Sequence, residues 1–127
     1  MLPRQRFNLL CVDDETTILE LLSAGFDHYG YDVQTADNGF SALLKVKKSP
    51  HRYQLIITDL RMPGLDGFGF IEEARAAGYG GPFMVYAGMI SPDDQQRLKE
   101  LHVSKLILKP ARTIELINAV KEIQASA

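Results

Sequence analysis

The sequence predicts a doubly wound α/β sandwich, in which helices cover both faces of one parallel sheet. Two observations lead to this fold class: five short apolar runs recur along the chain, and a helical pattern follows each of them. Strands that alternate with helices in this way are joined by right-handed crossovers. Such crossovers place helices on both faces of the sheet.

The five apolar runs are the expected strands. Four of them are apolar almost throughout, which is typical of parallel strands covered on both faces: 9–12, 55–58, 83–87 and 106–108. The run 31–36 instead alternates apolar and polar residues. Alternation suits a strand nearer an edge of the sheet.

Helical patterns fill the segments between and after the strands. Four apolar stripes at helical spacing are found at 18–26, 42–46, 68–75 and 114–123. The remaining helix is expected to begin at Ser91, because serine caps helices, Pro92 suits a first turn and Asp94 stands at the capping-box position. Helix-ending residues follow the first three stripes at Tyr29-Gly30, Ser49-Pro50 and 78–82.

Length and composition favour a single domain. The chain has 127 residues, 46% of them hydrophobic and 24% charged, which suffices for one core. We expect one domain over 1–127, with its core at about 7–124 and no output domain. A formal net charge of −2 without a basic run argues against direct nucleic-acid binding. No apolar stretch suits a membrane span or a signal peptide, so we expect a cytoplasmic protein.

Cys11 is the only cysteine of the chain. A disulfide within the chain is therefore excluded, and a cysteine-based metal site is not expected. Because Cys11 lies in the apolar run 9–12, we expect it to be a buried small hydrophobic residue.

Acidic residues and one lysine follow the predicted strands, where ligands of open parallel sheets bind. They are Asp13 and Asp14 after the first strand, Asp59 after the third and Lys109 after the fifth. Asp14 has a second interpretation, as the cap of the helix that follows it. Carboxylates that share one rim repel each other unless a cation lies between them. Ligands that offer only oxygen suit Mg²⁺ or Mn²⁺.

The same rim suits phosphoryl transfer. The ammonium of Lys109 and a metal ion would together offset charge on the phosphoryl oxygens. One carboxylate would then be the nucleophile, as in other aspartyl-phosphate chemistry. The loop 59–67 contains one proline and two glycines, which predict a tight turn that holds Asp59 and a backbone carbonyl in place, with a helix start near Asp66.

Four segments carry a more specific pattern at these strand ends. They are Leu10 to Glu15, Asp59 to Gly67 with the form D-x-x-M-P-x-x-D-G, Pro82 to Gly88, and Leu106 to Pro110. Together they resemble the receiver domain of bacterial two-component response regulators, from Asn8 to about Gln124. The resemblance implies a flavodoxin-like (βα)5 fold with five parallel strands in the order 2-1-3-4-5.

The resemblance also implies a role for each matching residue. Asp59 would be the phospho-acceptor, and Lys109 would contact the phosphoryl oxygens. Asp14, Asp59 and the backbone carbonyl of Arg61 would bind Mg²⁺ directly. Asp13 would act through a bound water.

Partners follow from the same resemblance. The phosphoryl donor would be a phosphohistidine on a sensor histidine kinase or on a histidine phosphotransfer protein. Apart from its own phosphorylation and dephosphorylation, the domain would catalyse nothing. A downstream protein partner would bind the face formed by 88–106, and neither nucleic acid nor a membrane would be contacted directly.

Two positions depart from the family pattern. Ala87 stands where the family usually has Ser or Thr, and Leu106 stands where it usually has Tyr or Phe. The backbone at Ala87 and Gly88 would still contact the phosphoryl group, but the usual hydroxyl and the turning ring are missing. Three outcomes stay open: output through 88–90 and the next helix, a role as phosphate carrier or sink, or a degenerate receiver that binds proteins without phosphorylation.

Two other classes of α/β protein fit the sequence less well. A metal-dependent phosphohydrolase needs a further acid or base and a cap, and the chain offers no D-x-D at a strand end. His28, His51 and His102 lie in or beside helical segments away from the rim. A flavodoxin-type flavin binder needs a hydroxyl-rich loop after the first strand, where this chain has acids.

Overall fold

The computed structural model describes residues 6–126 of the chain, in which five strands and five helices alternate. The strands are β1 Asn8–Val12, β2 Asp32–Ala36, β3 Leu55–Thr58, β4 Phe83–Ala87 and β5 Lys105–Leu108. The helices are α1 Thr16–His28, α2 Gly39–Lys48, α3 Gly67–Ala76, α4 Pro92–Glu100 and α5 Thr113–Ser126. Every predicted strand and helix is present.

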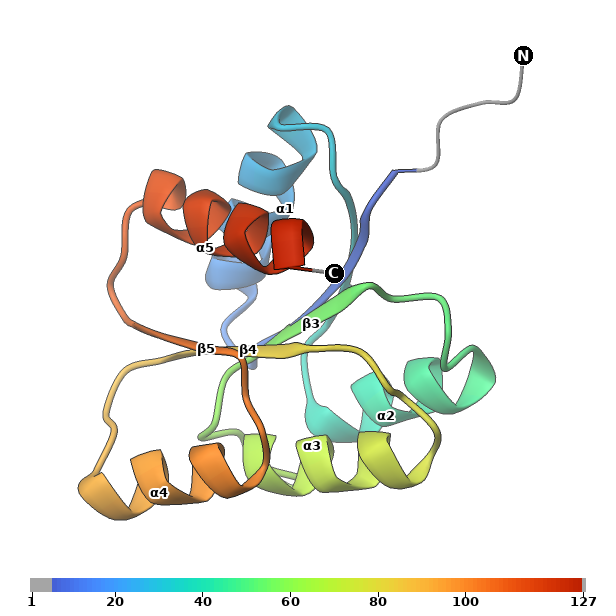
Figure 1. The fold of residues 1–127 in the computed structure, drawn as a ribbon, viewed down its shortest axis with the longest axis vertical. Coiled ribbons are helices and arrows are strands. Elements are labelled where there is room, and N and C mark those ends of the chain that lie inside the picture. Colours follow the sequence, from blue (N-terminus) through green and yellow to red (C-terminus); the bar gives the residue numbers. More distant parts are fainter. Residues whose placement is uncertain (1–5, 127) are drawn as a thin grey trace.

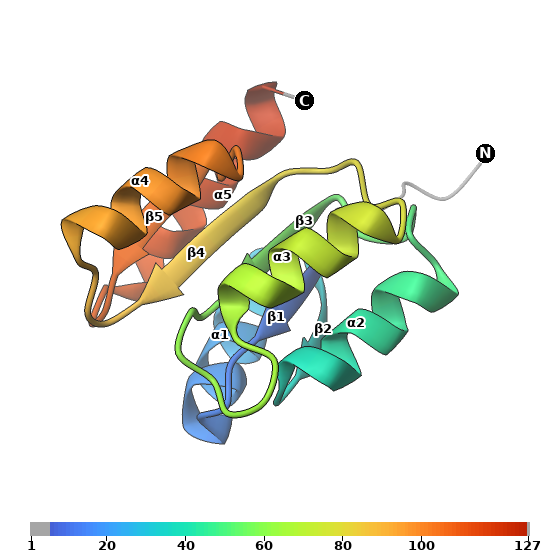
Figure 2. The same ribbon diagram turned by 90° about the horizontal axis from the view of Figure 1, so that it is seen from below.

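The strands form one parallel sheet in the order β2-β1-β3-β4-β5. Helices α1 and α5 cover one face of this sheet, and α2, α3 and α4 cover the other (Figure 1). Figure 2 shows α2, α3 and α4 side by side across that second face. The predicted fold class and strand order are therefore confirmed.

Two hydrophobic cores lie on the two faces of the sheet, and β1 contributes to both. Leu10 and Val12 belong to the core beneath α2, α3 and α4. Leu9 and Cys11 belong to the core beneath α1 and α5. Successive strand residues point to opposite faces, so a strand covered on both faces must be apolar at every position. The expected burial of Cys11 is confirmed.

The two edge strands differ in sequence although both have one open side. The alternating strand β2 is an edge strand, as its pattern predicted. The run 106–108 lies in β5, which is the other edge, and Leu108 is 54% exposed. The expectation that this run is covered on both faces holds in part: Leu106 and Ile107 pack against the two opposite cores, but they are only partly buried and Leu108 is exposed, because β5 has no further strand beside it in the described residues.

A side chain caps the start of α4, as its local sequence predicts, but no side chain caps the start of α1. The Ser91 hydroxyl accepts a hydrogen bond from the Asp94 amide at 3.0 Å, and Asp94 Oδ2 accepts one from the Ser91 amide at 3.1 Å. The predicted capping box is thus confirmed. Helix α1 begins after Glu15 with no side-chain cap, so Asp14 does not cap it.

Among residues 6–126, no helix combines the length and apolar character that a bilayer crossing requires.

Candidate functional site

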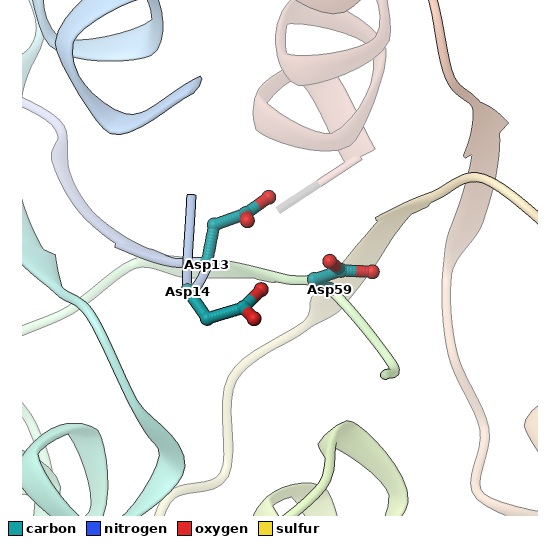
Figure 3. A group of neighbouring side chains, drawn as sticks. All are labelled: Asp13, Asp14 and Asp59. Carbon is teal, nitrogen blue, oxygen red and sulfur yellow. The ribbon is translucent and has the colours of Figure 1, made fainter. Parts of the chain in front are cut away.

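The ends of β1 and β3 bring three carboxylates together. Asp13 and Asp14 follow β1, Asp59 follows β3, and the amide of Asp59 donates to the carbonyl of Val12 at 3.0 Å. One carboxylate oxygen from each aspartate lies within 4.8 Å of the other two. Figure 3 shows Asp13 and Asp14 extending from the end of β1 toward the side where Asp59 lies. The predicted convergence of these acids is therefore present.

The three aspartates differ in their contact with solvent. Asp13 and Asp59 are buried, whereas Asp14 is exposed, so the cluster opens to water on the Asp14 side. Burial raises the pKa of the Asp13 carboxyl, and hydrogen bonds from Lys109 and from the Glu15 amide only partly oppose that rise. A cation placed among the three carboxylates would relieve both the burial cost and their mutual repulsion.

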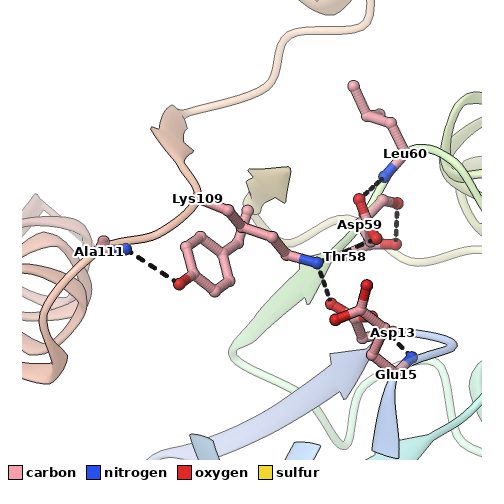
Figure 4. Close-up of polar contacts among 8 residues, drawn as sticks. Asp13, Glu15, Thr58, Asp59, Leu60, Lys109 and Ala111 are labelled. Atoms are coloured by element: carbon pink, nitrogen blue, oxygen red, sulfur yellow. Dashed lines mark hydrogen bonds and ion pairs between the residues drawn. The ribbon is translucent and has the colours of Figure 1, made fainter. Parts of the chain in front are cut away.

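Lys109 contacts this cluster from the end of β5, at the same rim of the sheet. Its Nζ atom donates to Asp13 Oδ2 at 2.7 Å and to Asp59 Oδ2 at 3.1 Å (Figure 4). Burial acts to lower the pKa of Lys109, but the hydrogen bonds and charges of Asp13 and Asp59 outweigh it, so the pKa is raised. Lys109 is therefore an ammonium ion at neutral pH, as the predicted phosphoryl contact requires.

Backbone and aromatic contacts hold Lys109 in place. Its amide donates to the carbonyl of Ala87 at 2.8 Å, which extends the pairing of β4 with β5 beyond the last strand residue. Its Nζ lies 5.5 Å from the ring centre of Tyr86. The Tyr86 hydroxyl in turn accepts a hydrogen bond from the Ala111 amide at 3.2 Å. Sequence reasoning did not identify Tyr86, because a tyrosine inside an apolar strand gives no signal beyond burial.

The loop after β3 orients Asp59. Its Oδ1 atom accepts a hydrogen bond from the Leu60 amide at 2.7 Å, which leaves Oδ2 facing Lys109. The Thr58 hydroxyl donates to the Asp59 carbonyl at 2.8 Å. A Cβ atom on Gly67 would lie 2.2 Å from that carbonyl oxygen, so the first residue of α3 must be glycine for the loop to close this tightly. The predicted tight turn is present.

The two positions that depart from the family pattern share one core. Ala87 is 1% exposed and lies in the core beneath α2, α3 and α4. Leu106 is half-buried against the same core. At Ala87 only a methyl group faces this core, and Gly88 after it is exposed.

Arg61 also has a side-chain contact that the sequence did not indicate. Its Nη2 atom lies 2.6 Å from Asp94 Oδ2 in the first turn of α4. Sequence reasoning assigned a role only to the Arg61 carbonyl. The two residues are far apart in the chain, and neither has a local pattern that pairs it with the other.

Comparisons with known proteins identify the family to which this fold belongs. A family model described as the response regulator receiver domain matches residues 9–121. The chain is 36% identical, over 115 residues, to a transcriptional regulatory protein described as a CpxR homolog from Haemophilus influenzae. That match covers 91% of this chain and 49% of the relative.

A similar segment also forms part of a much longer relative. The virulence sensor protein BvgS of Bordetella pertussis is 30% identical over 132 aligned residues, which cover 98% of this chain and 10% of that protein. The chain thus spans about half the length of the first relative and a small part of the second.

Among solved structures, the chemotaxis protein CheY4 of Vibrio cholerae superposes with a TM-score of 0.86 at 28% identity. That superposition covers 94% of this chain and 99% of CheY4. A receiver-domain protein from Methanospirillum hungatei superposes with a TM-score of 0.88 over 97% of this chain and all of that one, and at 22% identity it supports the fold alone.

Proposed function

The chain belongs to the response regulator receiver family, and we propose that it accepts a phosphoryl group on Asp59 in a two-component or phosphorelay system. The observation that carries this proposal is the position of Asp59 Oδ2, which lies 3.1 Å from the Lys109 ammonium inside a cluster of three carboxylates. An oriented carboxylate beside a fixed ammonium is suited to attack on an anionic phosphoryl group.

A divalent metal ion fits the acidic side of this site. The donor set consists of carboxylate oxygens, and the exposed Asp14 side leaves room for water ligands, which suits Mg²⁺ or Mn²⁺. We propose that Asp14, Asp59 and the Arg61 carbonyl hold the ion directly and that Asp13 holds it through water. When bound, the ion would neutralise charge on the phosphoryl oxygens and so allow two anions to meet.

The transfer itself needs few protein groups. A carboxylate oxygen of Asp59 forms a bond to phosphorus while the bond between phosphorus and the donor imidazole breaks, and the imidazole nitrogen leaves with the electron pair. Lys109 and the backbone at Ala87 and Gly88 contact the phosphoryl oxygens. In the second step of the cycle, water attacks the phosphorus of phosphorylated Asp59. This attack releases inorganic phosphate and restores the Asp59 carboxylate.

Family membership is the basis for proposing a phosphoryl donor and a downstream partner protein. A phosphohistidine on a sensor histidine kinase or a histidine phosphotransfer protein would supply the phosphoryl group in the cytoplasm. The face formed by 88–106 would contact a downstream protein. This face contains α4 and borders the core in which Ala87 and Leu106 lie.

Labelling with acetyl phosphate tests the proposed acceptor. With Mg²⁺ present, we expect the wild-type chain to gain one phosphoryl group by mass spectrometry and Asp59→Asn to gain none. Asp37→Asn is the matched control, because Asp37 follows β2 on the same rim but lies outside the acid cluster. Incorporation that persists in Asp59→Asn would refute the acceptor assignment.

A degenerate receiver that binds proteins without phosphorylation is the second candidate function. It is favoured by Ala87 and Leu106, which supply neither a hydroxyl nor a ring. Titration with beryllofluoride, which mimics a bound phosphoryl group, separates the candidates. A phospho-accepting domain binds it in the presence of Mg²⁺ and loses that binding in Asp59→Asn, whereas a degenerate domain does not bind it.

A further inference from the structure

We propose that Asp94 is a positioning residue for the metal site and that it acts through the side chain of Arg61. This inference rests on the proposed function, since the Arg61 carbonyl is one of the proposed ligands. It concerns how the loop after β3 is held and how the metal site communicates with α4.

The contact between Arg61 and Asp94 is close, and the position of Asp94 is fixed by its helix. Arg61 Nη2 lies 2.6 Å from Asp94 Oδ2. The Asp94 side chain is only 12% exposed, and its Oδ2 atom also accepts the Ser91 amide in the capping box of α4. The acceptor of the ion pair is therefore fixed by the first turn of a helix. The hydrogen bond from the Ser91 amide is the largest cause of a lowered pKa of the Asp94 carboxyl; burial opposes it, and Arg61 lowers the pKa further.

An aromatic ring provides a second support for this connection. The guanidinium carbon of Arg61 lies 5.8 Å from the ring centre of Phe68, and that of Arg97 lies 4.3 Å from it. Phe68 is buried in the first turn of α3, and Arg97 on α4 pairs with Glu72 on α3 at 3.3 Å. The two arginines thus join α4 to the loop and to α3 through one shared ring.

Only Arg61 among these contacts belongs to the proposed metal site. Its side chain is held by α4, and its backbone carbonyl is a proposed ligand two residues after Asp59. Restricting the side chain restricts the conformations of the residue that supplies the ligand, which favours the metal-bound loop. By thermodynamic reciprocity, a bound metal ion must then stabilise the contact with α4 by the same factor. This coupling needs neither a hydroxyl at position 87 nor a ring at position 106.

A double-mutant cycle on Mg²⁺ affinity tests the proposal. We expect Asp94→Asn to weaken Mg²⁺ binding about fivefold by titration calorimetry. Asparagine preserves an acceptor for the Ser91 amide, so the helix start is retained. In an Arg61→Met background, the same Asp94→Asn change should have no further effect, because the pair is already broken.

Two neighbours on α4 supply matched controls. Asp93→Asn removes the same charge from the adjacent exposed position, and Arg97→Met removes the other arginine at Phe68. Asp93→Asn should leave Mg²⁺ affinity nearly unchanged, and Arg97→Met should weaken it less than Asp94→Asn does, because the ion pair of Arg97 is with Glu72 and not with Arg61. Equal effects of Asp93→Asn and Asp94→Asn would mean that only long-range charge matters, and strictly additive effects of Asp94→Asn and Arg61→Met would mean that the pair does not act. Either result would overturn the inference.

Amide hydrogen exchange provides a readout that is independent of activity. Saturating Mg²⁺ should slow exchange in the first turn of wild-type α4 by about the same fivefold factor, and this change should vanish in Arg61→Met. If the wild-type chain binds no Mg²⁺, the proposed metal site fails and the inference fails with it. If Mg²⁺ binds but α4 exchange does not respond, only the inference is overturned.

Discussion

Lys109 Nζ donates a hydrogen bond of 2.7 Å to Asp13 Oδ2, and this bond joins the loop after β5 to the end of β1 across the rim of the sheet. The Asp13 side chain is 2% exposed and that of Lys109 is 15% exposed. The ammonium therefore compensates a carboxylate that water hardly reaches, and its loss should affect stability as well as chemistry.

We expect Lys109→Met to destabilise the fold by about 1–3 kcal/mol in urea unfolding, because it leaves the buried Asp13 carboxylate without its compensating ammonium. Mg²⁺ should recover more stability in this variant than in the wild type, since a metal ion would relieve the same repulsion. Lys105→Met is the control, because Lys105 forms a more exposed pair with Glu122. Equal losses in the two variants would contradict this role of Lys109.

The missing hydroxyl at position 87 can be restored with a matched control. Thr and Val have nearly the same shape, so Ala87→Val controls for the volume added at this buried position, and only Thr can donate to a phosphoryl oxygen. We expect the phosphorylation rate of the Thr variant with acetyl phosphate to exceed that of the Val variant about tenfold. Equal phosphorylation and dephosphorylation rates in both would show that the hydroxyl does not distinguish this domain from its family.

The close approach at Gly67 predicts a large effect of one added methyl group. We expect Gly67→Ala to destabilise the fold by about 1–3 kcal/mol and to slow phosphorylation, because its Cβ would force the Asp59 carbonyl away. Gly80→Ala is the control, since a Cβ at Gly80 would meet no atom within 4 Å. The check is urea unfolding together with acetyl phosphate labelling, and wild-type behaviour of Gly67→Ala would contradict the observed packing.

Burial raises the pKa of the Cys11 thiol to about 12, which predicts a pH dependence of stability. In the unfolded chain this thiol ionises near pH 8.5. A raised pKa in the folded state means that the stabilising contribution is complete below that pH and is lost as pH rises toward 12. Between pH 8.5 and 9.5 we expect a loss of about 1 kcal/mol in the free energy of unfolding.

Cys11→Ala isolates this effect. The variant should be less stable at pH 7.5 because it leaves a small cavity, but its stability should fall less steeply between pH 8.5 and 9.5. Parallel pH profiles for the two proteins would show that other groups cause the decline.

Much of this protein could be predicted because its signals are local. Strand and helix positions follow from periodicity, and the start of α4 follows from three residues within four positions, Ser91, Pro92 and Asp94. The acid cluster was predictable for a related reason. Residues that end parallel strands meet at one edge of the sheet, and the strand order that the family resemblance implies makes β1 and β3 neighbours, so Asp13 and Asp59 were expected to lie close together.

Predictions failed where the neighbourhood of a residue decides its role. The run 106–108 is as apolar as an inner strand, but β5 is an edge strand and Leu108 is exposed. A helix cap was one of two interpretations of Asp14, and the chain enters α1 through Glu15 without a side-chain cap. In both cases the residue type fits two environments, and the choice between them depends on strands and turns elsewhere in the chain.

By itself, the sequence determined the fold class and the acids and lysine at the rim, because these depend on periodicity and on which residues end each strand, while the strand order followed from the family resemblance. Only the tertiary structure decided that Lys109 bridges Asp13 and Asp59 and that Arg61 pairs with Asp94. The physical reason is that hydrogen bonds and ion pairs act over a few ångströms in space, while their partners lie far apart along the chain.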